Sequence, residues 1–549
     1  IDVYSRETGE PYFRIKPEFR IPRIRHDPAT LRDDDADDAA SLRWLRRALA
    51  LSGKSRDASS TPLLQHRRSR RSQILSGIER YEFAVELFRS AIAEGHPELR
   101  KELSRLLMDK SDRHGIMSDH SGQIEALTRA IGILRNLADK SGDPDLLSAL
   151  GDGYLRLGRA RDCLRQLEDA IDHFDQSISI MESIDPAHRT SDHLKILARA
   201  WISKGTALLH LGDYAQARRT IENGLDIINS HRDHIDVETL NDMLTVGTMN
   251  LASAVWSLDD ISTAIDLYTR VVKLIRSIDG HETQVNSLYR MAMAKSNIGL
   301  CYFRSGDIEA ALRYLVNSLK LLKKLVFDMD QDQFSSDYIL VCSNLGSIHE
   351  QSGNLEKALT IFNEAIRFHE DIVFNDGRNE LLDQLALLYR NKASVLVKRG
   401  NRIIAYDLYD NALRIWNYLY IRNEGVQVLE NATEAREWKA DALLLDHRFE
   451  DALEELRQAS HNLEIMIFTF DRSDLKAFYN RVLLKRACLM DRLGNETAAR
   501  EYLFIYQNKI QFCPDGQRLP VQSPWKEQCI ALLEKHGFSA DILHPVRDR

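Results

Sequence analysis

The stretch SNIGLCYFRSGDIEAALRYLVNSLKLL, residues 296–322, is followed by a second stretch of similar design, SNLGSIHEQSGNLEKALTIFNEAIRF, residues 343–368. Both place a Gly, a second Gly and an Ala at the same offsets, and Gly299 and Gly346 are 47 residues apart. Ala311 and Ala358 are separated by the same interval. A period of this size is typical of stacked supersecondary units that bury their apolar faces against their neighbours.

Small residues continue at this interval on both sides of the two stretches. One series consists of Ala217, Ala264, Ala311, Ala358, Ala405, Ala452 and Ala499. A second series lies 12 positions earlier and consists of Gly205, Ala252, Gly299, Gly346, Ala393, Ala440 and Ala487. We therefore expect two helices in each unit whose axes approach closely, because larger side chains would hold the backbones apart.

The pattern inside one unit predicts a helical hairpin. Leu315, Ser318 and Leu319 follow Ala311 at offsets of 4, 7 and 8, which is one face of a helix. Gly306, in the short SGD turn, is placed where the preceding helix ends. The sequence therefore predicts an all-α fold built from tandem helical hairpins.

These hairpins resemble the tetratricopeptide repeat family, whose units carry a Leu-Gly pair, a Gly at the turn and an Ala early in the second helix. The segment LGDGYLRLGRARDCLRQLEDAI, from Leu150, fits this pattern with Cys163 in place of the alanine, and Trp201 stands four residues before Gly205. The usual unit of the family has 34 residues. The longer unit is similar to those of kinesin light chains, rapsyn and the G-protein regulators with Asn-rich grooves. The resemblance implies a right-handed α-solenoid that binds its ligands in a concave groove, with both helices lengthened to about 18 to 20 residues.

The chain divides into four parts by pattern. Residues 1–75 are a non-repeat segment with an extended stretch, one acid-capped helix ending near Gly53 and a basic linker. Residues 76–190 hold irregular hairpins, residues 191–508 hold seven regular units, and residues 509–549 hold a loop and one capping helix. The chain does not begin with Met, which a processed N-terminus or a fragment of a longer polypeptide would explain.

Composition and charge limit the partner classes. The net charge of −8 argues against a surface built for nucleic acid, although a local basic groove would be compatible with it. No apolar run is long enough to cross a bilayer and no signal peptide is evident, so we expect a cytoplasmic protein. The six cysteines have no metal-site spacing, and we expect no metal or cofactor.

Several fragments suggest chemistry that their context does not support. The sequence SGKS, residues 52–55, ends like a phosphate-binding loop, but Ala48 occupies the position of the required Gly. His231 and His234 could share a metal ion, but they are expected in a loop between units, where a solvated pair is the simpler interpretation. The basic run HRRSRR, residues 66–71, could contact phosphate or an acidic partner, or form a solvated linker. We therefore expect no enzyme active site.

One register position carries the candidate binding residues. Two residues before successive small residues lie Asn250, Asn297, Asn344, Asn391, Trp438 and Lys485. The family resemblance places this position on the concave groove. Asn is a poor helix former, and its amide can both donate to and accept from a peptide backbone. Arg390 and Lys485 would add charge for an acidic or C-terminal carboxylate group. The alternative is that these amides bond to neighbouring units and set the helical pitch.

The prediction is therefore a protein-interaction scaffold that binds a peptide or partner segment, and not an enzyme. The second hypothesis is a sensor or autoinhibitory arm of a larger signalling enzyme, such as a STAND-type ATPase or a caspase-like protease, with its catalytic part outside this chain. A nucleic-acid-binding solenoid is a third alternative, which a steep salt dependence of binding would reveal.

Overall fold

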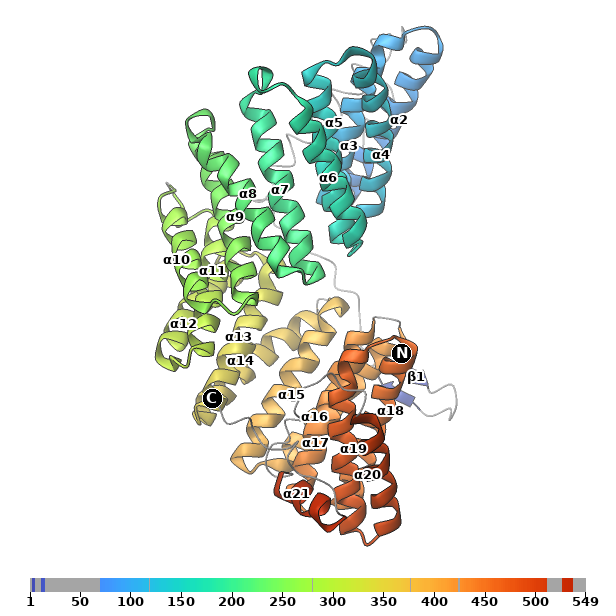
Figure 1. Cartoon of the computed structure of the whole chain (residues 1–549), viewed down its shortest axis with the longest axis vertical. Coiled ribbons are helices and arrows are strands. Elements are labelled where there is room, and N and C mark those ends of the chain that lie inside the picture. The colour runs from blue at the N-terminus through green and yellow to red at the C-terminus, as the bar shows by residue number, and fades with distance from the viewer. Residues whose placement is uncertain are drawn as a thin grey trace. The chain divides into compact units, whose positions relative to one another are not determined.

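The computed structural model describes residues 2–4, 11–14 and 70–536, except for residues 118, 279, 376, 423–424 and 511–525. The chain forms two compact units, residues 24–321 and residues 322–549 together with residues 1–23. We call them the N-terminal unit and the C-terminal unit. Within each, consecutive helices lie side by side and pack against one another (Figure 1).

The N-terminal unit is built from long helices joined by short turns. They are α2 (Arg70–Ala93), α3 (Arg100–Ile116), α4 (His120–Ser141), α5 (Pro144–Cys163), α6 (Leu167–Ser183), α7 (Ser191–Leu211), α8 (Tyr214–Ser230), α9 (Val237–Ser257), α10 (Ile261–Arg276), α11 (Val285–Arg304) and α12 (Ile308–Lys323), whose last residues enter the next unit. Short 3₁₀ turns η3 (Pro97–Leu99), η4 (Pro186–His188) and η5 (Arg232–His234) connect hairpins.

The C-terminal unit continues the same design. A π-helical turn, η6 (Lys324–Asp328), and η7 (Asp332–Phe334) lead into α13 (Ser335–Gln351), α14 (Leu355–Phe374), η8 (Asn379–Leu381), α15 (Leu382–Arg399), α16 (Arg402–Ile421), α17 (Val426–Leu445), α18 (Phe449–Thr469), η9 (Ser473–Leu475), α19 (Lys476–Arg492), α20 (Glu496–Ile510) and α21 (Lys526–Lys535). Strands β1 (Asp2–Tyr4) and β2 (Pro11–Arg14) pair antiparallel, and β2 lies against α16.

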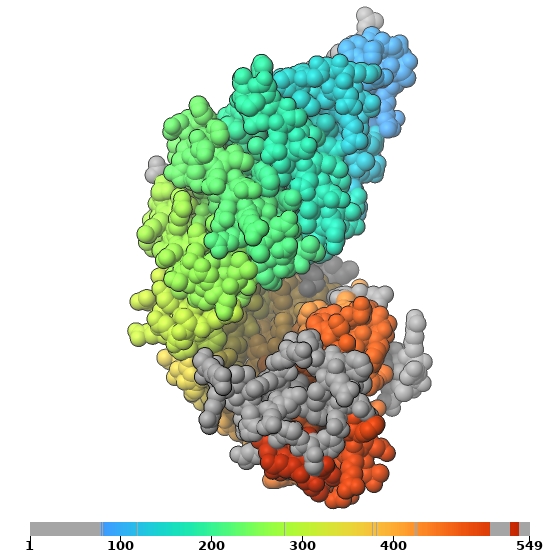
Figure 2. Space-filling view, viewed as in Figure 1, coloured from blue at the N-terminus to red at the C-terminus, as the bar shows by residue number. Residues whose placement is uncertain are grey.

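The small residues lie where the two helices of a hairpin cross. A Cβ atom on Gly299 of α11 would lie 2.8 Å from Leu315 Cγ and 3.1 Å from the backbone oxygen of Ala311, both on α12. The first helix therefore rests directly on the second, as the sequence predicts. The seven alanines of the second-helix series are fully buried. On the face that Figure 2 shows, side chains fill the spaces that the ribbons leave between neighbouring helices of the N-terminal unit.

One expected match in the first units is wrong. Cys163 is exposed and ends α5, so it is not the counterpart of the series alanines. Ala170 on α6 is fully buried, and a Cβ atom on Gly158 of α5 would lie 2.6 Å from Phe174 Cε1. Gly158 and Ala170 therefore mark the close contact of this hairpin. They lie seven residues after Gly151 and Cys163, the pair that the sequence pattern suggested.

The turn between the two helices of a hairpin uses left-handed backbone at one residue. In successive hairpins these residues are Arg165, Gly212, Asp259, Gly306, Gly353, Gly400, His447 and Gly494, all with positive φ. Gly400, with φ +95°, directly follows α15, and its N–H donates to the carbonyl of Val397. Left-handed backbone reverses the chain and caps free carbonyl groups, which brings the second helix back along the first.

Some predicted features fall outside the described residues. These are the helix ending near Gly53, the SGKS stretch, residues 66–69 of the basic run, and the loop of residues 511–525. Among the described helices, none carries an apolar stretch of the length that a bilayer crossing requires.

Gly299→Ala should destabilise the N-terminal unit by about 1 to 3 kcal/mol, because the new methyl group overlaps Leu315 and the Ala311 carbonyl. Gly132→Ala in α4 is the matched control, since nothing lies within 4 Å of its Cβ position. Because Gly132 is an exposed residue inside a helix, its replacement by Ala should stabilise the N-terminal unit by about 0.5 to 1 kcal/mol. Urea unfolding with hydrogen exchange on α11 and α12 measures both effects; equal effects of the two substitutions would contradict the close helix approach.

Candidate functional site

The predicted site residues lie on successive first helices of the hairpins. Asn250 is on α9, Asn297 on α11, Asn344 on α13, Asn391 on α15, Trp438 on α17 and Lys485 on α19. They are partly or fully buried: Asn391 is 9% exposed and Lys485 is 4% exposed. The register position therefore lies against neighbouring helices as much as against solvent.

In the N-terminal unit, two of the amides are bonded to adjacent helices. Asn250 Nδ2 donates to Thr206 Oγ1 on α7 at 2.7 Å. Asn297 hydrogen bonds with the hydroxyl of Tyr268 on α10. Both bonds join a first helix to the preceding hairpin, which is the packing role that the sequence left open as an alternative.

In the C-terminal unit, the two asparagines differ. Asn391 Nδ2 donates to Ser343 Oγ on α13 at 2.8 Å, and its Oδ1 accepts from the guanidinium of Arg390 at 3.4 Å. Asn344, next to Ser343, has no side-chain hydrogen bond to any residue that the structure describes, and it is partly exposed. Asn344 therefore keeps both its amide donor and its acceptor for another molecule.

Arg390 and Trp438 contact each other across two first helices. The Arg390 guanidinium lies 4.6 Å from the centre of the Trp438 ring, and its Nη1 donates to Glu434 Oε2 at 2.7 Å. Burial lowers the pKa of Arg390, and Glu434 opposes this by stabilising its charge. Glu434 thus holds the cation over the indole ring, at a distance typical of a cation–π contact.

Lys485 lies in a buried ion-pair group between α17 and α19. Its Nζ is 2.8 Å from Glu437 Oε1 and 2.7 Å from Asp441 Oδ1. Arg481 donates to both oxygens of Glu437 at 2.8 Å. Burial acts to raise the pKa of Glu437, but Lys485 and Arg481 outweigh it, so the pKa is lowered and the carboxylate stays charged.

These contacts bring four first helices of the C-terminal unit together along one row. Asn391 reaches α13 through Ser343, Arg390 reaches α17 through Glu434 and Trp438, and Lys485 joins α19 to α17. We call Asn344, Asn391, Arg390, Trp438 and Lys485 the first-helix row.

Sequence reasoning missed the carboxylates that hold this row, Glu434, Glu437 and Asp441. A signal was present, because the pairs Arg390–Glu434, Arg481–Glu437 and Lys485–Asp441 are each separated by 44 residues. That spacing is close to one period, so the partners lie on adjacent first helices.

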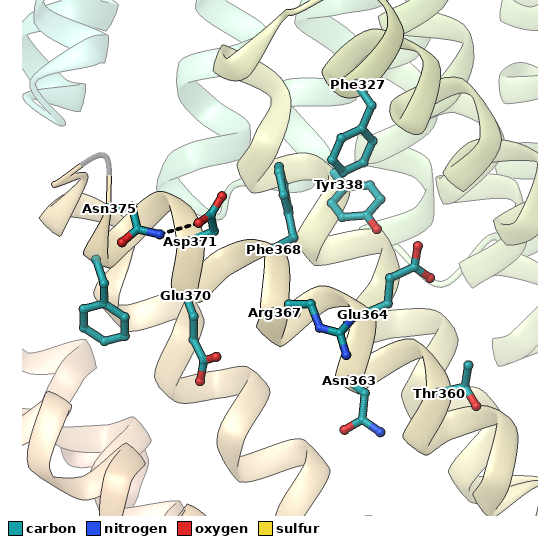
Figure 3. A pocket seen from close by; sticks show the side chains of 11 residues that line it. Phe327, Tyr338, Thr360, Asn363, Glu364, Arg367, Phe368, Glu370, Asp371 and Asn375 are labelled. Atoms are coloured by element: carbon teal, nitrogen blue, oxygen red, sulfur yellow. Dashed lines mark hydrogen bonds between the residues drawn. The ribbon is translucent and has the colours of Figure 1, made fainter. Parts of the chain in front are cut away.

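A second feature that the sequence did not indicate is a cavity of about 980 Å³ along α14, in the C-terminal unit. Figure 3 shows Phe327, Tyr338 and Phe368 grouped on one side of it, with Glu364, Arg367 and Asp371 pointing from α14. The Phe327 ring centre lies 4.6 Å from that of Phe368 and 5.4 Å from that of Tyr338, both in edge-to-face arrangements. An aromatic wall beside several carboxylates suits an apolar side chain with a cationic neighbour.

The histidine pair also lines a cavity, of about 430 Å³, in the N-terminal unit. His231 Nδ1 is 2.9 Å from the carbonyl oxygen of Ile227, and the ring centres of His231 and His234 are 6.5 Å apart. Within the described part of the chain, no three His, Cys, Asp or Glu residues are grouped as a metal site requires.

Family models match three short segments of the chain. Tetratricopeptide repeat models match residues 144–169 and 198–223 in the N-terminal unit and residues 340–370 in the C-terminal unit. The first segment covers α5 and the start of α6, and the other two cover parts of the hairpins α7–α8 and α13–α14. No curated protein matches the chain.

Several solved structures are similar to this chain at low identity. A STAND signal-transduction ATPase with a tetratricopeptide repeat sensor, from Pyrococcus horikoshii, is 13% identical with a TM-score of 0.48, over 89% of this chain and 66% of that one. The apo quorum sensor NprR from B. thuringiensis is 13% identical with a TM-score of 0.43, over 72% and 99%. The Rap conjugation gene regulator of plasmid pLS20, in complex with the Phr* peptide, is 16% identical with a TM-score of 0.35, over 74% and 95%.

Glu437→Gln should lower the free energy of unfolding by about 3 kcal/mol at pH 7, because Lys485 and Arg481 lose a buried counter-charge. The folded pKa of Glu437 is lowered, so its contribution is present above its unfolded pKa of about 4.3 and is lost as the pH falls through the folded value. The difference in the free energy of unfolding between variant and parent should therefore shrink in acid.

The control is Glu454→Gln, which breaks an exposed pair with Arg457 and should lower the free energy of unfolding by at most about 1 kcal/mol. Urea titrations at several pH values measure both; similar costs for the two variants would contradict the buried role of Glu437.

Tyr338→Phe should change stability by less than about 0.5 kcal/mol, because the buried Tyr338 hydroxyl has no nitrogen or oxygen partner among the described residues and hydrogen bonds with the thiol of Cys342, which is a weak partner. Tyr406→Phe is the control, since the Tyr406 hydroxyl donates to Asp446 Oδ2 at 2.6 Å. Its loss should cost about 1.5 kcal/mol. Melting temperatures of the two variants test this, and a cost at Tyr338 as large as at Tyr406 would show a hidden partner in the cavity.

Proposed function

We propose that this array of tetratricopeptide hairpins acts by binding, as a scaffold that holds a peptide or a partner segment along the first-helix row. The observation that carries the proposal is the continuity of the row. Its residues come from α13, α15, α17 and α19, and direct contacts join each of these helices to the next. An elongated ligand needs such a sequence of neighbouring contacts, one for each hairpin.

The row offers two kinds of contact to an extended chain. The Asn344 amide can donate to a peptide carbonyl and accept from a peptide N–H. Trp438 supplies an apolar ring, and the Arg390 guanidinium lies over it. Because ion pairs already hold the Arg390 and Lys485 side chains, a ligand would pay little conformational entropy to meet them.

An acidic group on the partner fits at Arg390. The side chain of its counter-ion Glu434 is 41% exposed, whereas that of Arg390 is 12% exposed. A carboxylate of the ligand can therefore replace Glu434 from the solvent side. Lys485 is less accessible, because Glu437 and Asp441 both contact it in a buried setting.

The second hypothesis, a sensor arm of a larger signalling enzyme, uses the same row. In that case the ligand would change the activity of a catalytic part outside this chain. The coding sequence on either side of this chain tests that hypothesis directly.

Asn344→Ala should weaken peptide binding about twofold to tenfold and leave the melting temperature unchanged, because the amide has no partner in the described structure. The peptide is first selected from a random display library against the full chain, and its affinity is measured by calorimetry. Asn391→Ala is the matched control, since it loses the bond to Ser343 and should lower the melting temperature. Unchanged affinity in the Asn344 variant would remove this row as the ligand site and favour a packing role for the asparagines.

A further inference from the structure

Two cysteines of the C-terminal unit lie in contact. Cys488 is on α19 and Cys529 is on α21, and their Sγ atoms are 3.3 Å apart. Cys488 is 3% exposed and Cys529 is fully buried. Both belong to the apolar core between the last hairpin and α21, which also contains Leu532 and Leu533. Residues on two separate helices thus meet through their thiols.

A small cavity with both apolar and polar lining residues reaches one of the two thiols. It has a volume of about 330 Å³ and is lined by Cys488, Asp491 and Arg492 of α19 and by Gln528 and Lys535 of α21. A water molecule occupies about 30 Å³, so the cavity can admit a molecule the size of hydrogen peroxide. Lys535, which lines the cavity, is paired with Asp491 at 2.6 Å and with Glu496 at 2.8 Å.

We propose that Cys488 and Cys529 form a redox modification site, at which a hydroperoxide oxidises the two thiols to a disulfide that joins α19 to α21. Cys488 reacts first, because it lines the cavity while Cys529 is enclosed in the core. Neither thiol belongs to the first-helix row, so this site is independent of the proposed binding function.

The reaction has two balanced steps. Cys488 first loses its proton, and the thiolate attacks one peroxide oxygen. The O–O bond breaks, and the products are a sulfenic acid on Cys488 and a hydroxide ion, which takes up the released proton to become one water molecule. The Cys529 sulfur then attacks the Cys488 sulfur, the S–O bond breaks, and the departing hydroxide takes the Cys529 proton as a second water molecule. The two thiols lose two electrons in total, and the peroxide gains these two electrons as it is reduced to water.

The surroundings make this a slow site and not a peroxidase. Hydrogen bonding with Cys529 and burial both raise the pKa of Cys488, and Arg492 only partly opposes them. Because the thiolate is the nucleophile, the rate of oxidation should rise with pH above neutrality. The site therefore responds to sustained exposure to peroxide.

The disulfide would fix the helix that covers the end of the last hairpin. Outside the apolar core, the contacts of α21 with α19 and α20 include the paired ammonium group of Lys535, which is 45% exposed. A covalent link at the centre of the contact removes the detached state of α21 from the accessible ensemble.

The experiment uses the full reduced chain, treated with hydrogen peroxide at pH 7.5 and at about pH 8.5, alkylated, digested and mapped by mass spectrometry. We expect a linked Cys488–Cys529 peptide that forms faster at the higher pH and disappears on reduction. Hydrogen exchange of the α21 amides should become at least about tenfold slower in the oxidised chain. Recovery of both cysteines as alkylated thiols, or a link from Cys488 to Cys513 instead, would overturn the proposal.

Variants identify the order of the steps. Cys529→Ser should abolish the link and leave a Cys488 sulfenic acid that dimedone traps, whereas Cys163→Ser, at an exposed cysteine, should leave the link unchanged. Dimedone labelling of Cys529 in Cys488→Ser at the same rate would show that the cavity does not set the order. If Cys529→Ser fails to fold, the pH dependence and the exchange data on the parent chain still decide the main inference.

Discussion

The close approach of the two helices in each hairpin is the contact on which the rest of the structure depends. At Gly299 a methyl group would already overlap Leu315 and the Ala311 backbone, so the two helix axes lie as near as their main chains allow. Short interaxial distances let residues on the buried faces interdigitate at high packing density. They also fix the direction in which the first helix faces its neighbours, and so position the first-helix row.

Charged contacts between first helices add specificity to this apolar framework. A buried group such as Glu437, Arg481 and Lys485 loses hydration on folding, and its attraction roughly offsets that loss. Its main effect is to select one register, because a shift of the helices would leave a buried charge without a partner. The row is therefore held in place before any ligand arrives, which lowers the entropic cost of binding.

The sequence was most informative where spacing and residue size acted together. Gly299 and Ala311 predicted a helix crossing because only small residues recur there, and the structure confirms it. Partners were harder to predict: the amide of Asn391 was visible in its register, but the Ser343 hydroxyl that it contacts is 48 residues away. Cys163 was matched wrongly because it lies 12 residues after Gly151, which is the same offset that separates Gly158 from Ala170. The cavity of Figure 3 depends on the π-helical turn that carries Phe327, which no residue pattern indicates.

The identity of the left-handed turn residue affects the local stability of each hairpin. Glycine adopts this backbone without steric cost, but Arg165, Asp259 and His447 hold it with a side chain. For residues other than glycine the left-handed conformation costs about 1 to 2 kcal/mol, less for aspartate, whose short side chain can bond locally. The hairpins α5–α6, α9–α10 and α17–α18 therefore store strain that their neighbours do not. In an array stabilised by nearest-neighbour contacts, thermal opening would begin at these hairpins. The hairpins between them, whose turns contain glycine, would stay closed for longer.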